Sequence, residues 1–333
     1  MCEKYRTLSR FIPGWEEFRV KERVVVALGG NAILQRGQRG TAAEQMENIQ
    51  RTAREVVKMI QAGYQVILTH GNGPQVGTIL IQNELGARQV PAMPMDICGA
   101  ESQGFIGYLF CQALANCARR KKIPLPKPVC IVTQVRVDRN DPAFRNPTKP
   151  VGPFFSEEEA RKRMNERKET WVEDAGRGWR RVVPSPDPKE IIEKDAVKTL
   201  VEQGFVVVAS GGGGIPVVEG EDGGLVGVEA VIDKDLAAER LAQDVKADLL
   251  LILTDVSQVL VRYRQPDEKP IGSIRAKELE VYHREGHFKS GSMGPKVEAT
   301  LRFVRNGGKR AVIARLDEAL EALEGTRGTQ VHP

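Results

Sequence analysis

The chain has 333 residues, of which 41% are hydrophobic and 28% charged, and its formal net charge is +5. This length and composition predict an ordinary globular protein with one large domain or two lobes. The charge excess is small and spread along the chain, which argues against a nucleic-acid partner. No stretch approaches the roughly 20 apolar residues that are needed to cross a bilayer, which argues against a membrane span.

Residues 1–22 are polar and charged and lack the apolar core of a secretory signal, so we expect a surface extension there and a cytoplasmic protein. Six short apolar runs follow. They are rich in β-branched residues and do not alternate with polar positions, which is typical of strands covered on both faces. The runs are Val24–Leu28, Val66–Thr69, Val129–Val137, Phe205–Ser210, Leu249–Val256 and Ala311–Ala314.

Helical patterns lie between these runs. Residues 43–62 carry apolar side chains at steps of three and four, and residues 189–203 and 296–306 repeat this design. Each pattern stops at a glycine, as helices commonly do. The repeated order of strand and helix predicts an α/β fold with a mainly parallel sheet and helices on both faces.

Two segments depart from this order. Residues 100–119 predict a helix that is apolar around most of its circumference, and the pattern leaves open whether it is internal or part of a subunit interface. Residues 138–183 break the alternation of strands and helices. Their charged run from Glu157 to Glu169 predicts a solvated helix. The whole block indicates an insertion that projects from the sheet, and long insertions are often lids or binding elements.

Glycine-rich segments follow several predicted strands, at the ends where open α/β sheets bind ligands. Glycine lets backbone N–H groups approach an anion, and a following helix N-terminus adds partial positive charge. One such loop is most simply a tight turn, but three at equivalent strand ends favour phosphate binding. They contain Gly29-Gly30-Asn31, Gly71-Asn72-Gly73 and Gly211-Gly212-Gly213, while Thr254-Asp255-Val256 closes a further strand.

Two common phosphate-binding motifs are absent. The sequence contains no GxxxxGK[ST], and Gly29-Gly30-Asn31 is not GxGxxG, so P-loop and dinucleotide folds are disfavoured. The five cysteines form no CxxC pair, and the four histidines show no metal-ligand spacing. We therefore expect a reducing compartment and no metal site built from protein side chains.

Phosphoryl transfer depends on charge neutralisation and alignment, for which lysine is suited. Lys234 and Lys296 both enter predicted helices, where the helix dipole disfavours a cation. Lys234 also stands between Asp233 and Asp235, and an anionic ligand explains this setting better than solvation does. Lys149 lies between two prolines of the insertion, and from pattern alone a plain loop lysine is the simpler interpretation.

Long collinear motifs surround these residues. They are Val26–Ala32, Thr69–Gly77, Cys98–Ala100, Ser102–Tyr108, Asp141–Phe144, Asn146–Phe154, Ile232–Asp235 and Gly291–Val297. Through them the chain resembles the carbamate kinases of the amino acid kinase superfamily, from about Val24 to Val331. Motifs of this length are much more specific than any single glycine loop.

The resemblance implies a three-layer α/β/α sandwich, the amino acid kinase fold, over residues 23–333. Residues 23–205 would form the carbamate-binding lobe, with 138–183 as a protruding subdomain, and residues 206–333 the nucleotide-binding lobe. It also implies reversible transfer between ATP and carbamate, giving ADP and carbamoyl phosphate. Mg²⁺ would arrive with the nucleotide. A homodimer and a role in ATP formation from arginine catabolism are further implications.

Residue roles follow from the matching positions. The catalytic group would be Lys149, Lys234 and Lys296, with Asp235 and then Asp233 orienting them. Gly29, Gly30 and Asn31 would face the transferred phosphoryl group, and Gly71, Asn72 and Gly73 would hold carbamate. The nucleotide would contact Gly211, Gly212, Gly213, Asp255, Tyr263, Met293 and Gly294.

Some positions depart from the family pattern. Glu101 stands where relatives commonly have methionine, and Ser257, Leu260 and Arg262 differ near the expected adenine site, which leaves nucleotide preference open.

Another small-acid kinase, such as an acetylglutamate kinase, is the nearest alternative function, and the motif Asn146–Phe154 argues against it. A non-catalytic nucleotide or carbamoyl-phosphate sensor is the alternative from another class, and the presence of all three lysines favours an enzyme.

Overall fold

The computed structural model describes residues 20–174, 176–288 and 292–333, so Cys2, Gly291 and most of the expected N-terminal extension lie outside the described residues. The helices are α1 (Ala42–Gln61), α2 (Gly73–Gly86), α3 (Met95–Lys121), α4 (Glu157–Arg167), α5 (Lys194–Glu202), α6 (Lys234–Asp244), α7 (Ala276–Arg284), α8 (Met293–Arg305) and α9 (Ala319–Leu323). Short 3-10 helices are η4 (Gly30–Ala32), η5 (Pro142–Phe144), η6 (Gly211–Gly213) and η7 (Leu316–Glu318).

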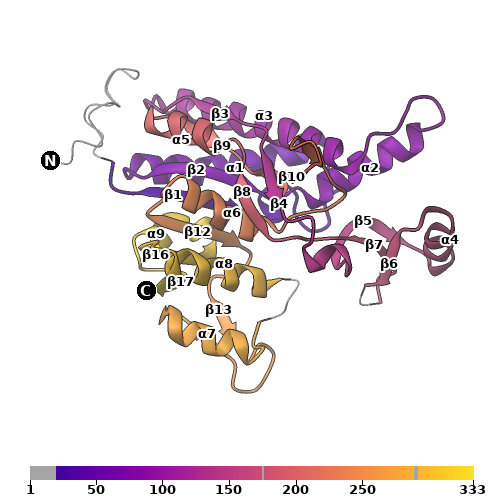
Figure 1. Ribbon diagram of the computed structural model, residues 1–333. Helices are drawn as coiled ribbons and strands as arrows, with labels where there is room; N and C mark the ends of the chain where they lie inside the picture. Colours follow the sequence, from indigo (N-terminus) through magenta and orange to yellow (C-terminus); the bar gives the residue numbers. More distant parts are fainter. Residues whose placement is uncertain (1–19, 175, 289–291) are drawn as a thin grey trace.

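The main sheet has eight strands within the described ranges, in the order β15-β17-β16-β12-β1-β2-β9-β3. Every neighbouring pair is parallel except β16 and β17. These strands are β1 (Arg23–Leu28), β2 (Gln65–His70), β3 (Pro128–Cys130), β9 (Val206–Val208), β12 (Leu249–Thr254), β15 (Ser273–Arg275), β16 (Arg310–Arg315) and β17 (Thr329–His332). Because β1 pairs with both β2 and β12, both predicted lobes share one sheet (Figure 1).

Helices cover both faces of this sheet. Alternate residues of β1 point to opposite sides, so Val25 and Ala27 enter one apolar core with side chains of α6 and α8. Val24, Val26 and Leu28 enter the other core, with side chains of α1, α3 and α9. The predicted three-layer α/β/α fold is therefore confirmed. The lobe boundary at residue 205 stays a prediction.

Helix α1 shows how local sequence sets the layers. Thr41 caps its first turn by accepting a hydrogen bond from the Glu44 backbone N–H, and the Glu44 carboxylate accepts one from the Thr41 N–H. Ile49, Val56 and Ile60 then lie on one buried stripe against the sheet. The predicted range of 43–62 differs from the observed helix by one residue at each end.

The prediction of one strand over Val129–Val137 was wrong. β3 ends at Cys130 in the main sheet, and β4 (Gln134–Val137) belongs to a separate four-stranded sheet. Between them, the Thr133 N–H donates to Gln103 Oε1 at 2.9 Å, and Gln103 Nε2 donates to Thr133 O at 3.1 Å. A buried amide side chain replaces the strand ladder there, which apolar periodicity does not reveal.

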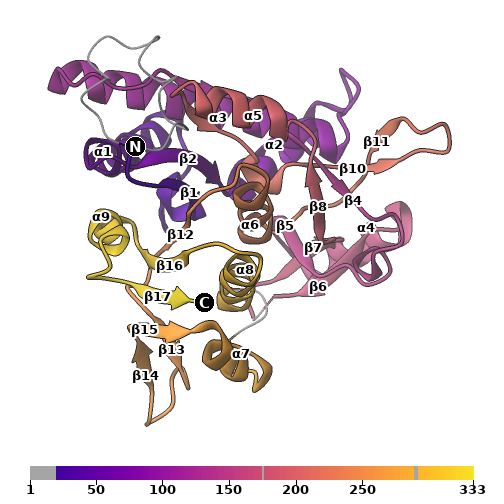
Figure 2. The same ribbon diagram turned by 60° about the vertical axis from the view of Figure 1, so that its left-hand side comes forward.

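The start of the predicted helix 189–203 was also wrong. Residues Pro188–Ile191 form β8, which pairs with β4, and α5 begins only at Lys194. Ile191 and Ile192 are apolar neighbours that fit a helical stripe as well as a buried strand, so the pattern was ambiguous. The remaining strands of this smaller sheet are β10 (Ile215–Glu219) and β11 (Leu225–Gly227). The β10–β11 hairpin extends to the side in Figure 2.

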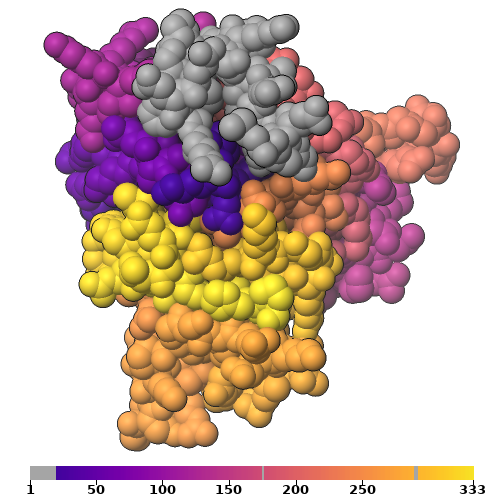
Figure 3. Space-filling view, turned by 90° about the vertical axis from the view of Figure 1, so that its left-hand side faces the viewer, coloured from indigo at the N-terminus to yellow at the C-terminus, as the bar shows by residue number. Residues whose placement is uncertain are grey.

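The predicted insertion forms a small subdomain that projects from the main body (Figure 1). Its three-stranded antiparallel sheet has the order β5-β7-β6 and is flanked by the charged helix α4. The strands are β5 (Lys149–Phe155), β6 (Thr170–Glu173) and β7 (Trp179–Val183). A second projection contains β13 (Val259–Val261), β14 (Lys269–Ile271) and α7, and appears in orange in Figure 3.

Helix α3 is longer than predicted and has one buried face. Ile106 and Phe110 are fully buried, whereas Tyr108 and Ile97 are 60% and 43% exposed. The structure thus gives the helix an internal role on one side, and its role in a subunit interface remains a prediction. Across the described parts of the chain, no helix combines the length and apolarity that a membrane crossing requires.

The contact between α3 and β3 gives a stability test. A Cβ added at Gly107 would lie 2.0 Å from Cys130 Sγ, whereas one at Gly104 of the same helix meets nothing within 4 Å. Overpacking of this kind costs about 2 kcal/mol, so Gly107→Ala should lower the free energy of unfolding by that amount. Gly104→Ala is the matched control and should leave it unchanged or slightly higher, because alanine favours helices. Equal urea midpoints for the two variants would contradict this packing.

Candidate active site

The first two glycine loops lie side by side at the carboxyl ends of β1 and β2. The Gly71 N–H donates to Leu28 O at 3.0 Å, which fixes the second loop against the end of β1. A Cβ added at Gly71 would lie 3.5 Å from the Gly30 nitrogen and 3.2 Å from Lys234 Cδ. The two loops and the stem of Lys234 therefore surround one small region of the molecule.

The third loop, η6, is interlocked with the second. Its backbone turns through positive φ at Gly212 (68°) and Gly213 (98°), a conformation that favours glycine. A Cβ added at Gly212 would lie 2.2 Å from Asn72 Nδ2, and one at Gly211 would lie 2.5 Å from His70 Nε2. No side chain fits at either position without displacing the second loop.

Buried hydrogen bonds hold these loops from below. Asn72 Nδ2 donates to Ser102 Oγ at 2.7 Å, and this hydroxyl donates to Gly99 O at 2.7 Å. The Ser210 N–H donates to Thr133 Oγ1 at 2.7 Å, and Thr69 Oγ1 donates to Ser210 O at 2.8 Å. Breaking a buried polar network leaves unsatisfied groups, so the loops have one preferred arrangement.

His70 supports the same region and is buried against Phe110, with ring centroids 6.0 Å apart. Its Nδ1 lies 3.0 Å from Gly71 O, which makes that nitrogen the protonated one. Burial lowers the pKa of His70 to about 4, and the hydrogen bond to Gly71 opposes this shift only in part. The side chain is thus a neutral imidazole at pH 7 that positions the loop.

The three predicted lysines meet on two aspartates at the N-terminus of α6. Lys149 Nζ lies 2.7 Å from Asp233 Oδ2, and Lys296 Nζ lies 2.9 Å from Asp235 Oδ2. Lys234 pairs with the other oxygen of Asp235. Asp233 also caps α6, because its Oδ1 accepts a hydrogen bond from the Asp235 N–H at 2.9 Å.

Because this cluster is buried, the pKa values of its members depend strongly on the neighbouring charges. Desolvation alone would raise the pKa of Asp235, but the charges and hydrogen bonds of Lys234 and Lys296 outweigh it and lower the pKa to about 2. Burial is also the largest influence on Lys234 and lowers its pKa, with Lys296 adding to this effect and Asp235 opposing it. An anion that entered the cluster would favour the charged form of Lys234.

Two adjoining cavities open beside the cluster. The larger has a volume of about 500 Å³ and is lined by Gly29, Gly30, Asn31, Lys234, Asp255 and Lys296 among others. The smaller, of about 210 Å³, is lined by Asp255, Tyr263, Met293 and Phe288 among others. Thr254, Asp255 and Ser292 line both cavities, so together they could hold an elongated ligand.

The remaining predicted positions lie around these cavities rather than on their walls. Lys234, which lines the larger cavity, touches Gly71 of the Gly71–Gly73 loop, and Asn72 of that loop touches Gly212 of Gly211–Gly213. Gly294 is buried in the first turn of α8. Sequence reasoning missed other residues that line the larger cavity, and the polar ones among them include Gln35, Arg51, Glu55, Arg315 and Asp317. Within the ranges that the structure describes, no three His, Cys, Asp or Glu side chains form a group that could hold a metal ion.

Comparison with known proteins agrees with this geometry. The family model for the amino acid kinase family matches residues 22–315. A carbamate kinase from Thermococcus kodakarensis is 60% identical over 93% of this chain and 99% of its own length. The chain belongs to the carbamate kinases of the amino acid kinase family. It is accordingly a phosphotransferase enzyme.

Two further relatives extend the comparison. A carbamate kinase from Pyrococcus horikoshii is 57% identical over 94% of this chain and 99% of its own length. The solved structure of carbamate kinase from Giardia lamblia bound to AMP-PNP superposes with a TM-score of 0.88 at 46% identity. It covers 93% of this chain and 98% of that one, so the fold agrees across nearly the whole molecule.

The pKa of His70 predicts a pH dependence of stability. The unfolded chain binds a proton at this residue below pH 6.5, whereas the folded protein resists protonation until about pH 4, so stability is lost as the pH falls through this window. Between pH 7 and pH 5 the loss from this residue is about 2 kcal/mol. His70→Gln should flatten the curve by that amount in urea unfolding. His332→Gln, at the partly exposed end of β17, is the control and should keep the original slope.

Proposed function

We propose that this chain catalyses reversible phosphoryl transfer between ATP and carbamate, giving ADP and carbamoyl phosphate. The observation that carries the proposal is the meeting of Lys149, Lys234 and Lys296 beside two contiguous glycine loops and a cavity of about 500 Å³. Relatives that are 55–60% identical over nearly their full length carry the name carbamate kinase, which supports this choice of acceptor.

The transfer would proceed in line. An oxygen of ionised carbamate attacks the γ-phosphorus while the bond to the β-phosphate oxygen of ADP breaks, and the electron pair leaves with ADP. Backbone N–H groups of Gly30 and Asn31 and the three ammonium groups would stabilise charge on the transferring oxygens, while the Gly29 N–H donates to Leu253 O at 3.1 Å. The attacking oxygen carries no proton, so no general base is required. The neutral state of His70, whose Nδ1 contacts Gly71 O, is compatible with this scheme.

The acceptor would lie at Gly71–Gly73. This loop is closed from behind by Gly211 and Gly212, at which even a methyl group would collide. Asn72 is held by Ser102 and is not free to rotate around a larger substrate. A tight, fixed loop suits a very small acid better than one with a side chain, and this supports carbamate over an acetylated amino acid.

The nucleotide would span the two cavities. Gly29, Gly30 and Lys296 on the larger one suit phosphates, whereas Tyr263, Met293 and Phe288 on the smaller one offer apolar and aromatic contacts for a base. The relative from Giardia lamblia was solved with AMP-PNP, an ATP analogue, which supports nucleotide binding here.

Mg²⁺ would accompany the nucleotide and neutralise its phosphates. Asp255, which lines both cavities, would offer it a carboxylate. One or two carboxylates with substrate phosphates are the usual ligand set for this ion.

The proposal extends to assembly and physiology. Exposed Tyr108 and Ile97 on α3 support a homodimer that covers this helix, and analytical ultracentrifugation would decide it. A cytoplasmic role in ATP formation from arginine catabolism remains part of the same proposal. Neighbouring genes for arginine deiminase and ornithine carbamoyltransferase would support that role.

Lys149→Ala tests the reaction and the role of the subdomain lysine together. We expect kcat for ATP formation from ADP and carbamoyl phosphate to fall at least about 100-fold with a modest change in KM for ADP, because the lost charge acts on the transferring group. The matched control is Lys162→Ala on exposed helix α4 of the same subdomain, which should retain normal turnover. A coupled assay that detects ATP provides the measurement.

The substrate comparison separates the alternatives. Acetyl phosphate and N-acetylglutamyl phosphate should give no ATP under the same conditions. ATP formation from the latter would favour an acetylglutamate kinase, and nucleotide binding without any turnover would favour a sensor. Normal turnover of Lys149→Ala would remove that lysine from the mechanism while leaving the reaction itself in place.

A further inference from the structure

The position of Lys149 depends on how the projecting subdomain is attached. Lys149 is the first residue of β5, which belongs to the subdomain sheet, whereas its partner Asp233 lies at the start of α6 in the main body. Their 2.7 Å contact exists only while the subdomain lies against that body. Contacts that attach the subdomain therefore set where this ammonium group lies.

The inner contact is made by α2. A Cβ added at Gly77 would lie 3.2 Å from Gly152 Cα, so the backbones of α2 and β5 approach closely. Val151 and Val183 of the subdomain form a small apolar cluster with Met95, and Leu80 of α2 packs against it. This cluster is far smaller than the two cores of the main sheet.

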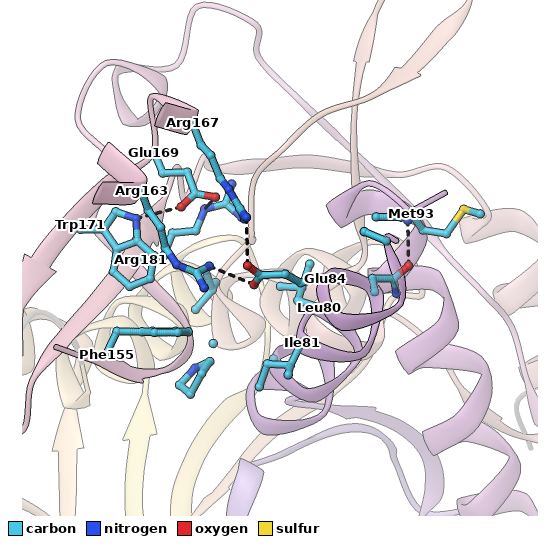
Figure 4. A pocket seen from close by; sticks show the side chains of 17 residues that line it. Leu80, Ile81, Glu84, Met93, Phe155, Arg163, Arg167, Glu169, Trp171 and Arg181 are labelled. Atoms are coloured by element: carbon cyan, nitrogen blue, oxygen red, sulfur yellow. Dashed lines mark hydrogen bonds and ion pairs between the residues drawn. The ribbon is translucent and has the colours of Figure 1, made fainter. Parts of the chain in front are cut away.

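The outer contact is ionic and lies near the end of α2. Glu84 accepts from Arg163 at 2.9 Å and pairs with Arg167 at 3.1 Å, so two arginines of α4 converge on one carboxylate (Figure 4). Burial raises the pKa of Glu84, but the hydrogen bonds and charges of these arginines outweigh it and bring the pKa below its ordinary value. The carboxylate is thus ionised at neutral pH.

Arg163 is itself held rigidly. Its guanidinium lies 4.4 Å from the centroid of the Phe155 ring and 5.7 Å from that of Trp171, and only 13% of its side chain is exposed. Glu159, one turn earlier on α4, also accepts from it at 3.0 Å. A desolvated, preoriented arginine forms a stronger ion pair than a freely moving surface side chain.

Between the inner and outer contacts lies a cavity of about 330 Å³, lined by Leu80, Ile81, Glu84, Phe155 and Arg163 among others (Figure 4). The interface is therefore not close-packed, and separating the subdomain from α2 would break few apolar contacts. The ion pair at Glu84 is therefore the main polar contact between the subdomain and α2, while Arg181 of β7 pairs with Glu229 elsewhere on the main body.

We propose that Glu84 is a positioning residue for phosphoryl transfer, which keeps the subdomain on α2, and Lys149 at the reacting phosphate, by holding Arg163 and Arg167. The proposal rests on the function proposed for Lys149. Helix α2 begins at Gly73 in the acceptor loop and ends at Gly86, so one rigid helix spaces the acceptor site from the attachment point.

Glu84→Gln tests this proposal with Glu159→Gln as its matched control. Both substitutions remove one carboxylate from Arg163, but only Glu84 lies across the boundary of the subdomain. In Glu84→Gln we expect kcat to fall about tenfold, less than the roughly 100-fold that a 1 Å misplacement of a reacting group can cost, with KM for ADP changing less than about twofold. Glu159→Gln should stay near the original kcat.

A second measurement asks whether Glu84 acts through Lys149. Adding Glu84→Gln to Lys149→Ala should cause no further loss of the residual kcat, because residues that act as a unit are not additive. An equal fold-loss in both backgrounds, or equal effects of Glu84→Gln and Glu159→Gln, would overturn the proposal.

Amide hydrogen exchange keeps the test independent of activity. Glu84→Gln should raise exchange in residues 149–183 and leave β1 and β2 unchanged, whereas Glu159→Gln should not raise exchange across the subdomain. If the original enzyme made no ATP from carbamoyl phosphate, the proposed function would fail, yet this exchange pattern would still show the attachment. Unchanged exchange in Glu84→Gln would overturn the attachment itself.

Discussion

The site depends on a buried carboxylate that holds two ammonium groups together. Lys234 and Lys296 would repel each other strongly in a partly desolvated region, and Asp235 lies between them with one oxygen toward each. Asp235 lies in the first turn of α6, where the helix dipole favours a negative charge and disfavours a lysine. The carboxylate therefore stabilises an arrangement of cations that the helix alone would not.

This cluster also connects segments that are distant in the sequence. Lys149 comes from the subdomain, Asp233 and Lys234 from α6, and Lys296 from α8, while the stem of Lys234 touches Gly71. None of these contacts lies in an apolar core. The two cores set the sheet and its helices, and the charged cluster then sets how the loops and subdomain meet above it.

Apolar periodicity predicted the parts of the fold where burial alone decides structure. β1, β2, β12 and β16 were found because they are covered on both faces. Apolar periodicity failed where a polar side chain determines the backbone path. At Thr133 the backbone pairs with the side-chain amide of Gln103 instead of continuing the strand. The prediction at Ile191 failed for another reason. A strand and a helix would each place this side chain equally well in an apolar layer.

The residues of the candidate site were also predictable only in part. Glycines after strands, and lysines where a helix dipole disfavours them, are anomalies that a sequence shows, so Lys234 and Lys296 were predictable from pattern. Lys149 carries no such anomaly and was predicted only through the family resemblance. Arg51 and Glu55 on the cavity wall carry no such signal, because charged residues on a helix face usually point to solvent. The ion pairs Lys149–Asp233 and Arg163–Glu84 connect residues 84 and 79 positions apart, which only the folded chain brings together.

Placing one of the three lysines on a projecting subdomain has a physical consequence. In the proposed reaction the acceptor is a very small acid that offers few groups to hold, and a lysine on a separate subdomain would allow charge to close around it after it enters. A small apolar contact near Gly77 and an ion pair at Glu84, with a cavity between them, join the subdomain to α2, so the place of Lys149 depends on a limited set of contacts. In that reaction the fixed loops would hold the acceptor, and the subdomain would bring the third ammonium group to it.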